Sequence, residues 1–292
     1  MEYVLLMLCT VIMSSQSFFK KSYGSKCPHG TYSFTVLIAG AAALFFALVA
    51  LLEGGFSYEW SVLPFSLSFG VGYAIATVTG VLALNIGSLT ITSLLITYSL
   101  MIPTLYGLLF LHEQPGVLKY VGIALLVISL YLVNAPSRKQ DEEERTGHRF
   151  SIKWLLLVLV SMLSNGIITI ILTEQQTRFA GAYKNEFMIV SLLVVCACML
   201  PFIIKQDKEH MGEILRKGAV PGVLCGLANG GTNLLVMVVT RTMAKSVFFP
   251  AISGGSMIVS YIVSRTVFKE RYTLVQNCGI LLGIVSLVLL NI

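Results

Sequence analysis

Long apolar runs separated by short polar stretches follow one another along the whole chain. The runs lie at residues 3–19, 31–52, 61–84, 88–111, 117–134, 152–173, 185–204, 218–240, 245–268 and 272–292. Each run is long enough to cross a bilayer as a helix, which takes roughly 20 apolar residues. Membrane β-strands would be only about ten residues long and would alternate between apolar and polar positions. The pattern therefore predicts an all-α membrane protein with ten transmembrane helices.

The longest polar stretch, residues 135–151, divides these runs into two groups of five. It contains Pro136, Gly147 and a mixed charge run from Arg138 to Arg145. Such a composition is typical of a solvated connection. We therefore predict a first five-helix repeat at 1–134, a linker at 135–151 and a second repeat at 152–292.

Polar and small residues recur at one offset near the ends of the two groups. The pairs, all 157 positions apart, are Glu113 and Glu270, Gly122 and Gly279, Ser129 and Ser286, and Asn134 and Asn291. Near the start of each group the offset is 151, and a longer loop at 205–217 than at 53–60 accounts for the difference. Five is an odd number, so the second repeat must enter the membrane from the opposite side. Such inverted repeats hold a binding site between them and expose it alternately to the two sides.

Each repeat ends in an apolar helix, a short turn with a glutamate and a final helix that contains glycine. The turns read Leu111-His112-Glu113 and Phe268-Lys269-Glu270. Over nearly its whole length the chain resembles the EamA-type transporters of the drug/metabolite transporter superfamily. That family usually has Gly-Glu in these turns, so the present chain resembles a divergent branch. The resemblance implies a transporter whose pathway is lined by the first, third and fourth helices of each repeat.

The composition excludes a soluble globule and a disordered chain. Hydrophobic residues make up 56% of the chain, charged residues 12%, and the mean hydropathy is +0.84, whereas a soluble domain has about 25% charged residues. The net charge of +6 comes from basic clusters beside apolar runs, as in loops at anionic lipid. These clusters lack the interleaved aromatic residues of a nucleic-acid surface. We therefore expect membrane lipid as a partner, and no nucleic acid.

Charged residues are confined to the ends of the apolar runs. A pump driven by protons usually needs a carboxylate that titrates inside the membrane, and no run has an Asp or Glu at its middle. This favours a facilitator or an exporter. The expected cargo is a small neutral, zwitterionic or amphipathic metabolite, such as an amino acid or an amine.

The candidate substrate-binding residues are uncharged polar side chains in the helices that the resemblance assigns to the pathway. Amides and hydroxyls in a membrane bind either a neighbouring helix or a solute, and tyrosine adds an aromatic wall with a polar tip. The candidates are Gln16, Tyr73, Thr77, Tyr98, Asn165, Asn229, Asn233, Ser253 and Ser256. We expect no catalytic residue, cofactor or metal.

Glycine recurs every four residues in the eighth run, at Gly218, Gly222, Gly226 and Gly230. Small residues at this spacing let two helices approach closely. The stripe serves either static packing or a surface on which helices rock. In the ninth run, Pro250 precedes Gly254 and Gly255, which predicts a kink or a local unwinding.

Two alternatives to transport stay open. The first is a membrane scaffold or sensor that moves no solute. The second is an intramembrane enzyme, which would need a catalytic constellation, but the four histidines lie far apart in loops and no HExxH or GxSxG motif occurs. We therefore predict a protein that is not an enzyme. Short loops favour a bacterial plasma membrane, and the oligomeric state stays open. The basic loops place both termini outside, whereas the resemblance implies cytoplasmic termini.

Overall fold

The computed structural model describes residues 2–27, 30–86, 98–111, 116–133, 152–266 and 273–291. Within these ranges all regular structure is helical, as the apolar pattern predicted. The linker at 135–151, the first part of the fourth run, and the turn residues Glu113 and Glu270 lie outside the described residues.

The chain forms two compact units, which we describe separately. Unit 1 comprises Met1–Thr10, Thr79–Ile167 and Met243–Ile292, and unit 2 comprises Val11–Val78 and Ile168–Thr242. Three helices contribute to both units. They are α1 (Glu2–Lys26), α3 (Leu63–Ile86, after the short turn η1, Trp60–Val62) and α8 (Ile152–Arg178).

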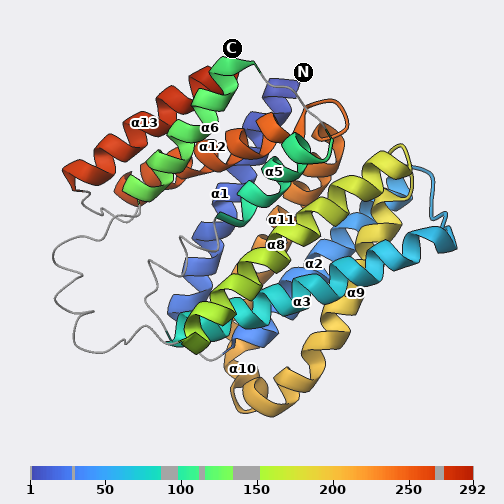
Figure 1. The fold of residues 1–292 in the computed structure, drawn as a ribbon. Coiled ribbons are helices and arrows are strands. Elements are labelled where there is room, and N and C mark those ends of the chain that lie inside the picture. Colours follow the sequence, from blue (N-terminus) through green and yellow to red (C-terminus); the bar gives the residue numbers. More distant parts are fainter. Residues whose placement is uncertain are drawn as a thin grey trace. The chain divides into compact units, whose positions relative to one another are not determined.

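Unit 2 is built around α2 (Thr31–Leu52), which packs against both α9 (Lys184–Phe202) and α11 (Ala219–Val239) (Figure 1). Small residues make this possible, because Ala39, Ala42 and Ala50 of α2 are all fully buried. Apolar side chains that face away from these contacts, such as Leu48 and Leu52, are exposed. This is the pattern of a helix surrounded by other helices and by lipid.

The segment between α9 and α11 is helical, so the predicted loop at 205–217 is wrong. Ile203–Asp207 and Ile214–Gly218 are π-helical turns, and between them lie a 3₁₀ turn (Lys208–His210) and the one-turn helix α10 (Met211–Glu213). Charged residues predicted a loop, but the buried Ile214 packs against Tyr23 and Cys27 of α1. Tertiary packing therefore decides the conformation of this segment.

Unit 1 contains α6 (Val117–Val133) and α13 (Leu274–Asn291), which lie side by side (Figure 1). Helix α12 (Lys245–Thr266) packs against this pair. It also packs against α5 (Met101–Leu109), which follows the 3₁₀ turn η2 (Tyr98–Leu100). Pro250 lies inside α12, and the helix is continuous through it, so of the two predicted alternatives the local unwinding is wrong and the kink stays a prediction.

Two hydrogen bonds join α6 and α13 in a reciprocal way. The Ser129 hydroxyl donates to the Gly279 carbonyl at 2.5 Å, and the Ser286 hydroxyl donates to the Gly122 carbonyl at 2.7 Å. Both serines are fully buried. The four residues are two of the pairs that recur at the offset of 157. Equivalent positions of the two helices thus make equivalent contacts with one another.

Four helical runs of the described chain are long and apolar enough to cross a membrane. They are Thr31–Leu52, Trp60–Gly80, Ile152–Arg178 and the run Lys184–Val239, which holds both α9 and α11. Shorter apolar helices include Glu2–Gln16 and Leu274–Ser286. Such lengths and compositions are those of a multi-pass membrane protein.

Candidate substrate site

A cluster of amide and hydroxyl groups joins α1 to α11 inside unit 2. The Gln16 amide donates to the Thr232 hydroxyl at 2.8 Å, and the Asn229 amide donates to the Gln16 side-chain oxygen at 3.3 Å. The Asn233 amide in turn donates to the Asn229 side-chain oxygen at 3.0 Å. We call these four residues the amide cluster. Three of the candidate residues, Gln16, Asn229 and Asn233, are thus brought together.

Helical spacing explains why α11 supplies three members of the amide cluster. Positions 229, 232 and 233 are three and four residues apart, so they share one face of the helix. Gln16 and Thr232 are buried, whereas Asn229 and Asn233 are only half-buried. An amide left without a partner in an apolar surrounding costs several kcal/mol. The hydrogen bonds within the cluster remove this cost. Asn229 and Asn233 stay partly accessible from outside the cluster.

The glycine stripe of α11 packs against α2. A methyl group at Gly226 would lie 2.7 Å from the Ile38 carbonyl oxygen, and one at Gly222 or Gly230 would lie within 2.9 Å of side chains of α2. Any larger residue would force the two helices apart. The stripe therefore holds α11 at a short, fixed distance from α2 in this structure.

Tyr73 belongs to an aromatic group in unit 2. Its ring is nearly parallel to that of Phe69, with centroids 6.1 Å apart, and Phe69 meets Phe187 edge to face at 5.5 Å. Tyr73 is half-buried. One turn further along α3, the Thr77 hydroxyl donates to the Tyr73 carbonyl of its own helix at 2.9 Å. A threonine bonded in this way satisfies its hydroxyl within its own helix.

The other candidates belong to unit 1. Asn165 is half-buried in α8 and donates to the Ser161 carbonyl at 2.8 Å. Ser253 is buried in α12. Ser256 lies on the same helix and Tyr98 in η2, but their side chains are outside the described part of the structure.

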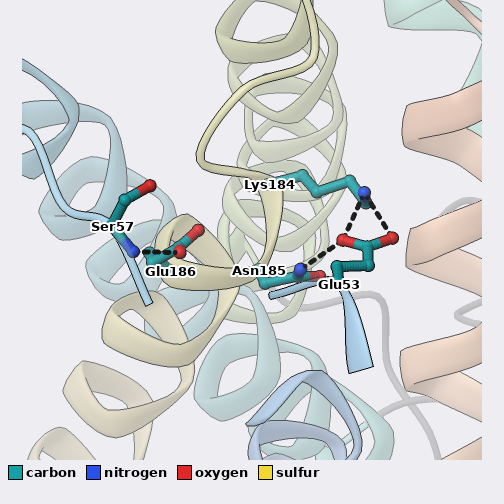
Figure 2. Close-up of polar contacts among 5 residues, drawn as sticks. All are labelled: Glu53, Ser57, Lys184, Asn185 and Glu186. Carbon is teal, nitrogen blue, oxygen red and sulfur yellow. Dashed lines mark hydrogen bonds and ion pairs between the residues drawn. The ribbon is translucent and has the colours of Figure 1, made fainter. Parts of the chain in front are cut away.

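Both ends of the α2–α9 pair are held by acidic side chains. At one end the Glu53 carboxylate accepts hydrogen bonds from Lys184 Nζ at 2.7 Å and from the Asn185 amide at 2.8 Å. These two residues open α9. The Glu186 carboxylate accepts the Ser57 backbone N–H at 2.9 Å. Figure 2 shows that both carboxylates connect the stretch after α2 to the first turn of α9.

At the other end, Asp207 accepts the backbone N–H of Ser33 at 2.6 Å. Ser33 lies in the first turn of α2, where N–H groups have no partner within the helix. This role could not be predicted from the sequence, because Asp207 stands in a run of charged residues that is typical of a loop. Burial of Asp207, which is 1% exposed, is what distinguishes it from its neighbours.

Long apolar helices and an uncharged amide cluster among them define a multi-pass membrane protein, and the comparisons give its class as a transporter. The sugar transport protein family matches residues 19–292, and the chain belongs to this family. The family is related to the drug/metabolite transporter superfamily, so the predicted resemblance is confirmed at that coarser level. Membership also agrees with the predicted role as a transporter and not an enzyme.

Two further comparisons add a relative and a fold. An uncharacterized protein of Haemophilus influenzae is 23% identical over 189 residues, which are 64% of this chain and 60% of that relative. The match thus spans under two thirds of the relative's length. A protein of known crystal structure is similar with a TM-score of 0.73 and 12% identity, covering 100% of this chain and 98% of that one. This likeness concerns the fold alone.

Proposed function

We propose that this protein is a bacterial plasma-membrane carrier that moves a neutral sugar by alternating access between two inverted five-helix repeats. The observation that carries the proposal is the amide cluster, because it offers hydrogen-bond donors and acceptors and no charge. The substrate-binding residues are Gln16, Asn229 and Asn233, with Tyr73 as an aromatic wall. Thr77, Tyr98, Asn165, Ser253 and Ser256 remain pathway candidates.

The chemistry of a sugar fits these groups. A side-chain amide donates through its NH₂ and accepts through its oxygen, as a sugar hydroxyl also does. Asn229 and Asn233 are half-buried and therefore reachable, while the buried Gln16 and Thr232 orient them. A hydroxyl that enters the cluster would exchange one neutral hydrogen bond for another. The family description names sugars, so we favour them over the amino acids and amines that the sequence suggested.

The inverted repeat is supported by three sets of paired contacts. The first is the reciprocal bonding of α6 and α13. The second joins each third helix to the second helix of the other repeat: Gly226 lies against the Ile38 carbonyl, and Gly70 of α3 lies against the Ser191 carbonyl, each within 2.7 Å of an added methyl group. The third is the acidic residue at each end of the α2–α9 pair. We propose repeats at 1–134 and 152–292, joined by the linker at 135–151.

Uptake into proteoliposomes tests the function. We expect the purified protein to move a hexose or a pentose down its gradient, in competition with other sugars but not with amino acids or amines. Uptake of an amino acid or an amine alone would overturn the sugar and leave transport standing. Failure to move any of these solutes by correctly folded protein would favour the scaffold.

A matched pair of variants tests the site. Thr232→Val removes the hydroxyl that accepts from Gln16, and we expect sugar uptake to fall about tenfold, the effect of one lost hydrogen bond. Thr35→Val is the control, because Thr35 is also buried but, among the described residues, its hydroxyl bonds only to the Thr31 carbonyl one turn before it in α2. Equal losses in the two variants would contradict the site.

A further inference from the structure

The basic segment Ile203–Gly218, between α9 and α11, points to a binding surface for lipid. We call this segment the foot. We propose that the foot binds anionic phospholipid headgroups at the cytoplasmic face of the membrane. This inference concerns residues outside the amide cluster, and it holds whatever solute the protein moves.

The foot is a folded part of unit 2. Ile214, which is 1% exposed, packs against Tyr23 and Cys27 at the end of α1. Asp207 holds the first turn of α2 through the Ser33 N–H. The Cβ position of Gly218 lies against the Tyr23 ring. Side chains on the outer surface of the foot are therefore presented by an ordered backbone, so binding costs little further loss of conformational freedom.

The outer surface of the foot is basic and apolar together. Lys205, Lys208, Arg216 and Lys217 are exposed. Ile204 and Leu215 are 66% and 57% exposed, beside Lys205 and Arg216 in the sequence. The foot connects two helices of membrane-spanning length, so it lies at a membrane surface. Basic side chains next to exposed apolar ones are what a segment in the headgroup layer requires, because the former bind phosphates and the latter enter the acyl boundary.

The charges at the two ends of unit 2 decide which leaflet the foot faces. The foot and the last turns of α1 carry seven basic residues and three acidic ones. The basic residues are Lys20, Lys21, Lys26, Lys205, Lys208, Arg216 and Lys217, and the acidic residues are Asp207, Glu209 and Glu213. The opposite end of unit 2 carries Arg178, Lys184 and Arg241 against Glu53, Glu59, Glu174 and Glu186. Basic residues accumulate on the cytoplasmic side, where the leaflet is anionic. The start of α1 then lies on the outer side.

Thermal unfolding in lipid–detergent micelles tests the lipid. We expect phosphatidylglycerol to raise the melting temperature of the wild type by about 3 °C or more over phosphatidylcholine, because a ligand of the folded state stabilises it by mass action. The quadruple variant with Lys205, Lys208, Arg216 and Lys217 changed to glutamine should lose this difference. A full difference in the variant would overturn the proposal. An equal shift with glycerol phosphate would also overturn it, since a soluble anion would then suffice.

Two controls keep the result specific. Glu209→Gln removes an exposed charge from the same segment and should keep the full lipid effect. A second variant changes each of the three lysines to arginine and Arg216 to lysine, which alters the side chains but keeps their charge. This variant should also keep the full lipid effect. Loss of the lipid effect in this charge-conserving variant would show that binding depends on the shape of the side chains and not on their charge, and would overturn the proposal.

Labelling with a membrane-impermeant maleimide tests the leaflet. Lys208→Cys should react only after cells are permeabilised. Tyr58→Cys, on the stretch between α2 and α3 at the opposite end of unit 2, should react in intact cells. The unsubstituted protein, with its own six cysteines, gives the background. The reverse pattern would overturn the cytoplasmic placement.

Discussion

The two ends of the α2–α9 pair use the same arrangement in different surroundings. At each end an acidic residue that follows one helix binds the first turn of the other. Asp207 is 1% exposed and binds a backbone N–H. The Glu53 side chain is 46% exposed and binds the side chains of Lys184 and Asn185.

This difference predicts unequal energies for the two ends. A hydrogen bond from a fixed backbone donor to a buried carboxylate contributes about 1.5–3 kcal/mol, and its loss leaves buried groups unpaired. An exposed ion pair contributes only about 0–1 kcal/mol, because water and salt screen it and two flexible side chains must be ordered. The Asp207 bond should therefore contribute more to holding the pair together than the Glu53 ion pair does.

Of the substitutions at the two ends, Asp207→Ala should have the largest effect on stability. It removes the acceptor of the Ser33 N–H, and we expect the free energy of unfolding to fall by about 2–3 kcal/mol. The melting temperature of the detergent-purified protein measures the loss. Glu209→Ala, which removes an exposed carboxylate two residues further on, is the control and should change little. A melting temperature equal to that of the wild type would remove the basis of the comparison.

Ser33→Ala, at the same end of the pair, should increase the free energy of unfolding. The Ser33 hydroxyl is buried and has no hydrogen-bond partner in the described part of the chain. Alanine keeps the backbone N–H that Asp207 binds and removes the unpaired oxygen, so we expect a gain of about 1 kcal/mol. Thermal unfolding beside the wild type measures it. A clear loss of stability would mean that the hydroxyl has a partner.

Glu53→Gln should have the smallest effect, a loss of about 0.5 kcal/mol at low salt that disappears at high salt. Glutamine keeps a hydrogen-bond acceptor but removes the ion pair. The hydrogen bond from Lys184, with further help from Asn185, lowers the pKa of the Glu53 carboxyl below its ordinary value of 4.5.

The sign of the pH dependence follows from this lowered pKa. The contribution of Glu53 is complete above pH 4.5 and is lost as the pH falls through the lower value of the folded protein. The melting temperatures of the wild type and of Glu53→Gln should therefore differ at pH 7 and converge in acid. A difference that grows in acid would contradict this reading.

Much of the fold could be predicted from the sequence, because membrane-spanning helices leave a strong signal. The described helices begin and end close to the apolar runs, as α2 does at Thr31 and Leu52. The helical conformation of the foot could not be predicted, since it depends on the packing of Ile214 against Tyr23. Contacts between residues far apart in the sequence leave no local pattern.

The amide cluster could be predicted in part, because its amides stand out within apolar runs. Amides in apolar runs are conspicuous, and this signal was enough to select Gln16, Asn229 and Asn233. Thr232 was harder to select, because most membrane threonines bond to their own helix, as Thr77 does. Only the structure shows that Thr232 also accepts from Gln16.

The attachment of α2 to α9 at both ends also gives the pair a fixed length, which makes it sensitive to the thickness of the bilayer. Helix α2 has 22 residues, which at about 1.5 Å each span about 33 Å, close to the hydrocarbon thickness of about 30 Å. Because both ends are bound, neither helix can slide along the other to shorten the pair. A thinner membrane must then tilt the pair as one body, or break the exposed Glu53 ion pair before the buried Asp207 bond. Hydrophobic mismatch would thus act on this protein through its exposed ion pair first.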